Sequence, residues 1–358
     1  MKLIVAGPTG TVEHDGGSFH PEQPARLFSV MDGVRALGLE DEVVCPPTPM
    51  ADMSDLVRVH SRSYLNELEA LCANGGGDID PDTYARADSW NAARRAAGAG
   101  LAAIAALEEH GDGVAFVPVR PPGHHAGRET AMGFCLLNNV AIAAASLTAR
   151  HQRVLIVDWD VHHGNGTQSI FWDDPNVLYV SSHQSPLFPG TGKAVEVGGP
   201  GALGLTVNVP LPAGATGDVV RGAIDDVARP TIEEFSADWV LVSCGFDAHH
   251  ADPLGELALS SGDFAELARL VNEFTPRPGR LALFLEGGYN QRALELSVTA
   301  TLGALLGIPT HSTPPTYGGP GMVELRATVA DRHRVIERLH EAPRLATASA
   351  GQRGGRST

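Results

Sequence analysis

The segment RVLIVDWDVHHGNG, residues 153–166, contains the pattern that indicates the fold class most directly. Its apolar part, VLIV at 154–157, does not alternate with polar residues, and polar residues begin directly after it. A strand that is apolar at successive positions is buried on both faces, as in a parallel sheet with helices on each side. Ligands of such sheets bind beyond the carboxyl ends of the strands. The segment therefore predicts a buried parallel strand followed by a loop of functional residues.

Similar apolar runs recur at residues 2–6, 114–119, 177–181, 205–209, 239–243 and 281–285. Between them lie stretches rich in Ala, Leu, Arg and Glu that are long enough for crossover helices, at 89–109, 138–150, 218–235, 261–275 and 292–306. This order predicts one α/β domain over residues 1–342, with a doubly wound parallel sheet flanked by helices and the active site at the carboxyl ends of its strands.

The end of the chain has a different composition. Residues 323–341 have a helical pattern, whereas residues 343–358 are small and polar, have nothing to bury, and predict a disordered tail. The segment GAGLAA at 98–103 resembles a dinucleotide-binding loop, but it follows helical sequence instead of a strand, which argues against a nicotinamide site.

Composition limits the partners. With 26 Lys and Arg against 42 Asp and Glu, the formal net charge is -16, which argues against nucleic acid and favours cationic substrates, although such charge can also serve solubility alone. No apolar run has the length of a membrane span, and no signal peptide is recognisable. The four cysteines lie far apart, as in proteins of a reducing compartment. We expect a cytoplasmic protein with no membrane partner.

Two of the strand-end loops carry the residue types of a metal site. Asp158, Asp160 and His162 alternate after the strand at 154–157, so they point to one side if the strand continues. Asp247 follows the run at 239–243 and reaches the same edge. One such Asp is more often a helix cap, and a lone His pair is more often a loop feature. Together they predict a catalytic metal site with one imidazole, two carboxylates and an open position for water.

Two further loops add proton-transfer groups at the same edge. The Pro-stiffened loop RPPGHHA, residues 120–126, carries His124 and His125, and a His beside a metal is a natural general base. In EGGY, residues 286–289, the two glycines allow a close backbone approach, and Tyr289 offers a hydrogen-bond donor for an oxyanion.

These motifs resemble the zinc-dependent histone deacetylases and their bacterial relatives, the histone deacetylase-like amidohydrolases, particularly of class II. The motifs are HPEQPAR (20–26), RPPGHHA (120–126), GFCLLNNVAIAA (133–144), VDWDVHHGNGTQ (157–168), FPGTG (188–192), GFDAHHADPLG (245–255) and EGGY (286–289). The resemblance covers roughly residues 14 to 310. It implies an arginase/deacetylase-type fold and a zinc-dependent hydrolase that acts on linear amide bonds.

The resemblance also implies the metal ligands. It assigns Asp160, His162 and Asp247 to one catalytic Zn²⁺, in agreement with the spacing. The same ligand types suit iron, so the metal used in the cell stays open. A structural K⁺ is implied as well, held mostly through backbone oxygens of Asp158, Asp160, His162, Ser181 and Ser182.

Catalytic roles follow from the same resemblance. It implies that His125 is the general base and acid, that His124 stands beside it, and that Asp158 and Asn165 are the partners of these imidazoles. Tyr289 would polarise the acyl carbonyl. An amide at position 165 would raise the pKa of His125 less than a carboxylate would.

The implied substrate tunnel suits an unbranched aliphatic stem. Phe134 and Phe188 would wall it and Gly133 would lie near its floor, although either Phe alone could equally be a core residue. Arg26 would line an internal channel for the released acetate, and the alternative is a structural ion pair near a helix start.

The tunnel rim bears on the substrate. Leu254 stands where some polyamine-selective relatives have an acidic residue, and the region 71–90 lacks the insertion typical of bacterial acetylpolyamine enzymes. Both features favour acyl-lysine over a polyamine. Asp78, Asp80 and Asp82 could form an acidic rim that attracts either cation, or they could be solvated loop charges.

The other histidines near these motifs are predicted to be structural or to belong to outer walls; they are His14, His20, His60, His183, His249 and His250.

The function predicted is the removal of acetyl or other short acyl groups from acyl-lysine or a similar linear acylated amine in a peptide or small molecule. Alternatives are an acetylpolyamine amidohydrolase, a ureohydrolase-like enzyme with two Mn²⁺ ions, and a non-catalytic acyl-binding protein. The one-metal pattern and RPPGHHA argue against two ions, and the intact ligands and phenol argue against a binding protein. Homo-oligomer formation stays open.

Overall fold

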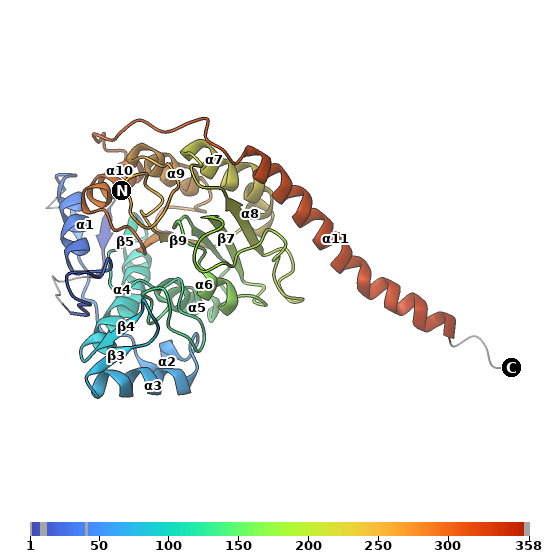
Figure 1. Cartoon of the computed structure of the whole chain (residues 1–358), viewed down its shortest axis with the longest axis horizontal. Helices are drawn as coiled ribbons and strands as arrows, with labels where there is room; N and C mark the ends of the chain where they lie inside the picture. Colours follow the sequence, from blue (N-terminus) through green and yellow to red (C-terminus); the bar gives the residue numbers. More distant parts are fainter. Residues whose placement is uncertain (1, 8–12, 40–41, 354–358) are drawn as a thin grey trace.

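Eight parallel strands form the central sheet of the computed structural model, which describes residues 2–7, 13–39 and 42–353, with side chains to residue 339 (Figure 1). The strand order is β2-β1-β5-β10-β9-β6-β7-β8, and every neighbouring pair is parallel. The strands are β1 (Leu3–Val5), β2 (Val43–Val44), β5 (Val114–Val117), β6 (Val154–Asp158), β7 (Val177–Gln184), β8 (Thr206–Leu211), β9 (Trp239–Cys244) and β10 (Leu281–Leu285). The predicted α/β class with a parallel sheet is confirmed.

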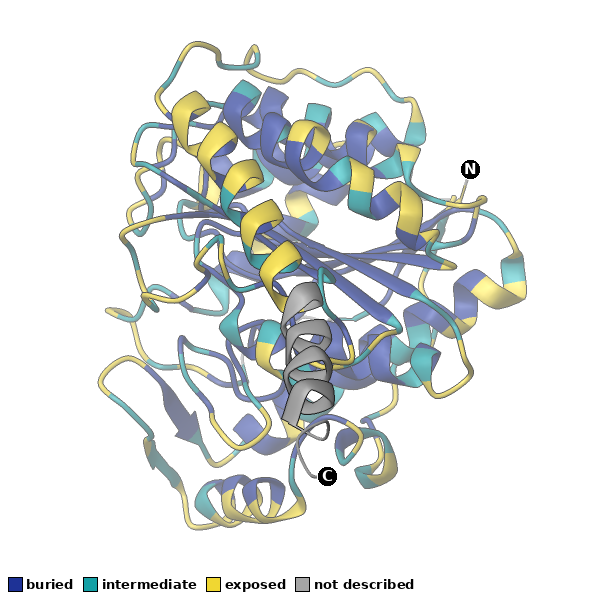
Figure 2. Cartoon of the chain, turned by 90° about the vertical axis from the view of Figure 1, so that its right-hand side faces the viewer, coloured by how far each residue is buried: buried dark blue, intermediate teal, exposed yellow. Residues whose placement is uncertain are grey.

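Both faces of the sheet are covered, which explains the unbroken apolar runs. In β6, Leu155 and Val157 belong to the hydrophobic cluster on one face, and Val154 and Ile156 belong to the cluster on the other. All four side chains are fully buried. Because successive strand residues face opposite sides, a strand between two helical layers needs an apolar side chain at every position. Figure 2 shows the buried strands between the two layers.

The helices divide between the two faces (Figure 1). One face is covered by α1 (Ala25–Arg35), α7 (Gly217–Gly222), the π-helix η1 (Ala223–Ala228), α8 (Arg229–Phe235), α9 (Ser261–Glu273) and α10 (Gln291–Leu306). The other is covered by α2 (Met53–Leu56), α3 (Arg62–Ala73), α4 (Ser89–His110) and α5 (Asn139–Thr148). The short α6 (Asn165–Ile170) follows the loop after β6, and α11 (Met322–Arg353) contacts β8, η1 and α7. No described helix is long and apolar enough to cross a membrane.

Some elements differ from the prediction. The predicted helix at 218–235 consists of α7, η1 and α8, which adjoin without a break. Three short strands were not predicted: β2, and the antiparallel pair β3 (Gly76–Asp78) and β4 (Tyr84–Arg86). The last helix extends to Arg353, beyond the predicted end at 341. The predicted tail at 343–358 lies outside the residues whose side chains are described, so the tail and the single-domain boundary stay predictions.

The strand order positions the functional loops. The four strands β5, β10, β9 and β6 are consecutive neighbours in the sheet. Phe284 of β10 pairs with Val117 of β5 and Ser243 of β9, and Ser243 also pairs with Asp158 of β6, so these strands end at nearly the same level. The loops that follow them therefore meet at one edge of the sheet.

Candidate active site

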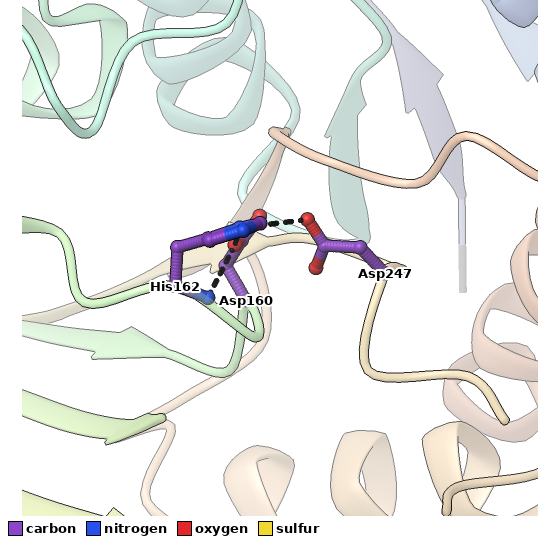
Figure 3. Close-up of side chains that lie close together, drawn as sticks. All are labelled: Asp160, His162 and Asp247. Atoms are coloured by element: carbon purple, nitrogen blue, oxygen red, sulfur yellow. Dashed lines mark hydrogen bonds and ion pairs between the residues drawn. The ribbon is translucent and has the colours of Figure 1, made fainter. Parts of the chain in front are cut away.

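Three side chains from two of these loops converge on one point (Figure 3). Asp160 and His162 follow β6, Asp247 follows β9, and one ligand atom from each lies within 4.8 Å of the others. Nδ1 of His162 is 3.1 Å from Oδ1 of Asp160 and 3.3 Å from Oδ2 of Asp247. The structure thus brings together the three residues predicted to bind the metal.

The surroundings of this group fit a cation. Oδ2 of Asp247 is buried and, apart from its ion-pair contact with His162, has no hydrogen-bond partner among the described residues, whereas Oδ1 accepts from the backbone N–H of Val161 at 2.9 Å. Burial, reinforced by the charge of Asp160, raises the pKa of Asp247 to about 7. Burial opposes the charged form of His162, but the two carboxylates overcome it and raise its pKa to about 10. A metal cation bound between the two carboxylates would balance their negative charge in place of a protonated His162.

Glycines make room for the carboxylates. A Cβ atom on Gly245 would lie 2.0 Å from Oδ2 of Asp160, and one on Gly287 would lie 1.9 Å from Oδ2 of Asp247. The backbone N–H of Gly287 also donates to Oδ2 of Asp160 at 2.8 Å. A side chain at either position would displace a carboxylate oxygen.

The two histidines of the loop after β5 stand beside this group and have different partners. Nδ1 of His124 donates to Oδ2 of Asp158 at 3.0 Å, and Nδ1 of His125 lies 2.8 Å from Oδ1 of Asn165. Burial alone would lower the pKa of His124, but Asp160, Asp158 and Glu286 raise it well above the ordinary value. Burial lowers the pKa of His125 far below that value, and the charges of His124 and His162 lower it further. His125 is therefore the neutral imidazole of the pair.

Tyr289 is held from both sides of its loop. Its backbone N–H donates to Oδ2 of Asp252 at 2.6 Å, and the guanidinium of Arg26 lies 4.8 Å from the centre of its ring. Arg26 is fully buried and pairs with Glu22 at 3.1 Å, while its Nε donates to the carbonyl oxygen of Gly288 at 2.7 Å. These contacts are those of a structural ion pair, and the acetate channel stays a prediction.

A cavity of about 340 Å³ reaches the histidines and the tyrosine. Its lining joins the side chains predicted for catalysis and for the tunnel: His125, Gly133, Phe134, His162, Phe188, Leu254 and Tyr289, together with Leu187 and Asp82. The ring of His125 lies edge-on to that of Phe188, with 5.1 Å between the ring centres. Of the three predicted rim carboxylates, Asp82 lines this cavity, and Asp78 and Asp80 do not.

Of the five residues predicted for K⁺, three lie at the β6–β7 pair, and the other two, Asp160 and His162, lie in the loop after β6. Asp158 is opposite Ser181 in the sheet, and Ser182 is the next residue of β7. Oγ of Ser181 is 2.9 Å from Nδ1 of His183, and the buried Oγ of Ser182 has no hydrogen-bond partner among the described residues.

The other histidines have nearby hydrogen-bond partners outside the metal group. The contacts are His14 with Ser89, His20 with Asp82, His60 with Gly127, His183 with Gly192, His249 with Ala251 and His250 with Leu259.

Sequence reasoning missed three residues whose side chains contact the functional loops. Asp252 accepts from the backbone of Tyr289, and the hydroxyl of Tyr179 donates to Oδ2 of Asp158 at 3.0 Å. The buried carboxylate of Glu286, in the EGGY motif, accepts hydrogen bonds from the loop after β5. Nothing in a single sequence distinguishes these three from ordinary core or loop residues.

Comparison with known proteins gives the same family. The histone deacetylase domain matches residues 20–305, which is most of the chain. The chain belongs to the histone deacetylase family. The chain is 36% identical to a histone deacetylase-like amidohydrolase of Pseudomonas aeruginosa, and the alignment covers 95% of this chain and 90% of the relative. A probable deacetylase of Archaeoglobus fulgidus is 38% identical, over 83% and 84% of the two chains.

The crystal structure of the HDA15 HD domain shows the same fold. It superposes on this histone deacetylase-family chain with a TM-score of 0.84 and 34% identity, over 98% of this chain and 99% of that one. The predicted arginase/deacetylase-type fold is therefore confirmed, and the protein is a deacetylase or amidohydrolase of this family.

Proposed function

We propose that the protein is a zinc-dependent amidohydrolase that removes acetyl or other short acyl groups from acyl-lysine or a similar linear acylated amine. The observation that carries this proposal is one cavity whose walls are apolar and whose lining also includes His125, His162 and Tyr289. Such a cavity accepts an apolar stem and delivers its amide to a metal ligand, a base and a phenol at the same time.

Asp160, His162 and Asp247 would hold the ion. Two carboxylates and one imidazole leave a coordination position open, as catalytic zinc sites require. When bound, zinc would lower the pKa of a water molecule to about 7 and polarise the acyl carbonyl.

His125 would move the protons. Its Nδ1–H donates to the amide oxygen of Asn165, which leaves Nε2 without a proton and able to accept one. Because its pKa is lowered, the imidazole of His125 is mostly in the neutral form, which is the form that can accept a proton as a base. The same imidazole, once protonated, can hand the proton to the departing amine nitrogen.

Tyr289 and His124 would stabilise the negative charge that develops on the carbonyl oxygen. The ring of Tyr289 lies edge-on to that of Phe134 at the cavity wall, with 5.7 Å between the ring centres, and burial raises the pKa of its hydroxyl well above the ordinary value. The phenol therefore stays protonated and can donate a hydrogen bond to the oxyanion. His124, held as a cation by its carboxylate neighbours, adds positive charge beside it.

The cavity walls favour an unbranched stem. Phe134, Phe188, Leu187 and Leu254 are apolar, and the rim position 254 carries no charge that would select a second ammonium group. We therefore expect acyl-lysine substrates ahead of acylpolyamines. The acid Asp82 in the lining is the one observation that supports the polyamine alternative.

One catalytic ion, a structural K⁺ and an amine-bearing partner complete the proposed site. Within the described residues, one group of His, Cys, Asp and Glu side chains has metal-ligand spacing, which favours one catalytic ion over two Mn²⁺ ions. The unpartnered Ser182 hydroxyl beside the pair of Asp158 and Ser181 supports a structural K⁺. The net charge of -16 supports a peptide or small-molecule amine, and no nucleic acid, as partner. The four free cysteines support a cytoplasmic setting.

The test compares turnover of a fluorogenic acetyl-lysine peptide and of N-acetylputrescine by the zinc-loaded protein. We expect faster cleavage of the peptide, abolished in His125→Ala and reduced on the order of 10² to 10³-fold in Tyr289→Phe, as for loss of an oxyanion donor. Faster cleavage of N-acetylputrescine would keep the mechanism and replace the substrate class. Turnover unchanged in both variants would contradict the assigned roles.

A further inference from the structure

The loop that presents His124 and His125 has few backbone donors of its own. Between Arg120 and His124 the chain contains two prolines, which have no N–H. The remaining donors are the N–H groups of Gly123 and His124, and Gly123 begins a turn in which its carbonyl oxygen accepts from the N–H of Ala126 at 3.0 Å. Both histidines lie inside this turn, so whatever holds its first residues sets the backbone position from which both imidazoles reach Asp158 and Asn165.

One carboxylate oxygen accepts both of these N–H groups. Oε2 of Glu286 lies 2.7 Å from the backbone nitrogen of Gly123 and 3.1 Å from that of His124. The other oxygen, Oε1, accepts from the hydroxyl of Ser243 at 3.2 Å. Glu286 is fully buried and directly follows β10, whose neighbours in the sheet are β5 and β9. It therefore ties together the ends of three adjacent strands.

Other contacts hold the loop at different atoms. The side-chain amide of Asn139 donates to the carbonyl oxygen of Pro121 at 3.1 Å, and that of Asn138 donates to the carbonyl oxygen of Ala126, also at 3.1 Å. The backbone N–H of Thr167 donates to the carbonyl oxygen of His124 at 3.1 Å. None of these contacts reaches the N–H groups at the start of the turn. Without an acceptor there, two buried donors would be left unpaired, and the turn would shift to find partners.

We propose that Glu286 is a positioning residue that holds the His124–His125 turn in its catalytic place through these two backbone hydrogen bonds. Glu286 neither lines the cavity nor belongs to the group of Asp160, His162 and Asp247, so we place its effect in the loop and not on the substrate. The inference rests on the proposed function, because it concerns how the proposed base is aligned. A displacement of about 1 Å in a catalytic group can cost on the order of 10²-fold in rate.

Two substitutions distinguish the effect of the length of the Glu286 side chain from the effect of its charge. In Glu286→Gln the side chain has the same length, its amide oxygen can accept both N–H groups, and its NH₂ can donate to the Ser243 hydroxyl. In Glu286→Asp the charge is kept, but the carboxylate is one methylene shorter and is withdrawn from both N–H groups. We expect Glu286→Gln to keep most of the turnover, and Glu286→Asp to lose about 10²-fold in kcat with little change in KM.

The control is Ser243→Ala, which removes the hydrogen bond to the other oxygen and leaves the turn untouched; its turnover should stay close to that of the unmodified protein. A second readout is hydrogen exchange of the Gly123 and His124 amides by NMR. Exchange should be slow in the unmodified protein, in Glu286→Gln and in Ser243→Ala, and faster in Glu286→Asp.

Several outcomes would overturn the proposal. The first is a larger loss of turnover in Glu286→Gln than in Glu286→Asp, because this would assign the effect to the charge of the carboxylate. The second is a loss of turnover in Ser243→Ala equal to that in Glu286→Asp. The third is amide exchange that no variant alters. If Glu286→Asp does not fold, the turnover of Glu286→Gln decides between reach and charge. If the unmodified protein cleaves neither test substrate, the proposed function fails, while amide exchange still tests the position of the turn.

Discussion

Asn165 gives the His125 imidazole an uncharged partner. Its amide oxygen lies 2.8 Å from Nδ1 of His125, and burial together with the charges of His124 and His162 keeps the pKa of His125 far below its ordinary value. An amide orients the ring without adding a negative charge, so nothing in this contact favours the imidazolium strongly.

Asn165→Asp should therefore raise the pKa of His125. A base is active in its neutral form, so the acid limb of the profile of kcat/KM against pH should move to higher pH, and activity near the foot of that limb should fall. The measurement is the pH–rate profile on the acetyl-lysine peptide. Asn74→Asp, which adds the same charge at an exposed helix end, is the control. A shift to lower pH would show that His125 is not the group that titrates.

A substitution at Gly287 should weaken metal binding. A Cβ there would lie 1.9 Å from Oδ2 of Asp247 and 2.7 Å from Oδ2 of Asp160, so Gly287→Ala must displace at least one carboxylate. We expect the purified variant to bind much less zinc than the unmodified protein, measured by metal analysis after dialysis. Gly77→Ala, whose Cβ would meet its nearest neighbour at an ordinary 3.5 Å, should bind zinc normally. Full zinc occupancy in Gly287→Ala would contradict the assigned ligand set.

Among single residues, the sequence predicted those whose side chains themselves bind a metal or transfer a proton. The alternation of Asp160 and His162 after a strand, and Asp247 after another, sufficed to place three side chains at one point. Glu286 and Asp252 were not predicted because they act by accepting backbone N–H groups. Such contacts depend on which loops the fold brings together, and a carboxylate leaves no local signature of that role.

Helix α9 illustrates how local sequence fixes an element. Ser260 accepts from the N–H of Asp263, and the carboxylate of Asp263 accepts from the N–H of Ser260, so the first turn is closed from both sides. Such reciprocal capping pairs groups that the helix itself cannot satisfy.

Ser260→Ala should lower the free energy of unfolding by about 1 to 2 kcal/mol, because the capping hydrogen bond from the N–H of Asp263 is lost together with the bond that the Ser260 hydroxyl donates to the carbonyl oxygen of Pro314. Urea denaturation checks this value. Ser54→Ala, at an exposed position of α2, should change the free energy by less than about 0.5 kcal/mol. An equal loss in both variants would mean that the cap contributes nothing specific.

Among the elements, long buried strands were predictable and short ones were not. Strand β6 reads as an unbroken apolar run because both of its faces pack against helices. Strand β2 has two residues, and β3 begins with two glycines, so neither has enough side chains to form a recognisable pattern. The π-helical turn η1 inside the predicted helix at 218–235 was not predicted either, because its sequence, AIDDVA, contains nothing that distinguishes a π-helical turn from an α-helical one.

For the molecule as a whole, metal binding should couple to stability. The folded chain assembles Asp160 and His162 with Asp247 from a distant part of the sequence, so the unfolded chain has no such site. Zinc at about 100 times its dissociation constant should add about 2.7 kcal/mol to the free energy of unfolding. Thermal unfolding with zinc and with a chelator measures the difference. Asp247→Asn should abolish most of it, and a zinc effect that survives in this variant would place the ion elsewhere.

The overall architecture was the part most fully predicted. Seven apolar runs separated by helical stretches leave few arrangements other than a parallel sheet covered on both faces. The order of the strands was not predicted, since the run of β5, β10, β9 and β6 depends on crossovers that no local pattern specifies. That order is nevertheless what brings the four functional loops together.

The sheet ends at β8, and α11 covers its open side. The guanidinium of Arg332 donates to the backbone carbonyl oxygens of Thr206 and Gly204 there. An uncovered edge strand offers unpaired backbone groups on which another chain can add as a further strand. A chain shortened at residue 321 should therefore self-associate more strongly with rising concentration than the full chain does, as light scattering would show. A helix that contributes no catalytic group would in this way protect the enzyme from aggregation, and a purification tag is better joined beyond it than in its place.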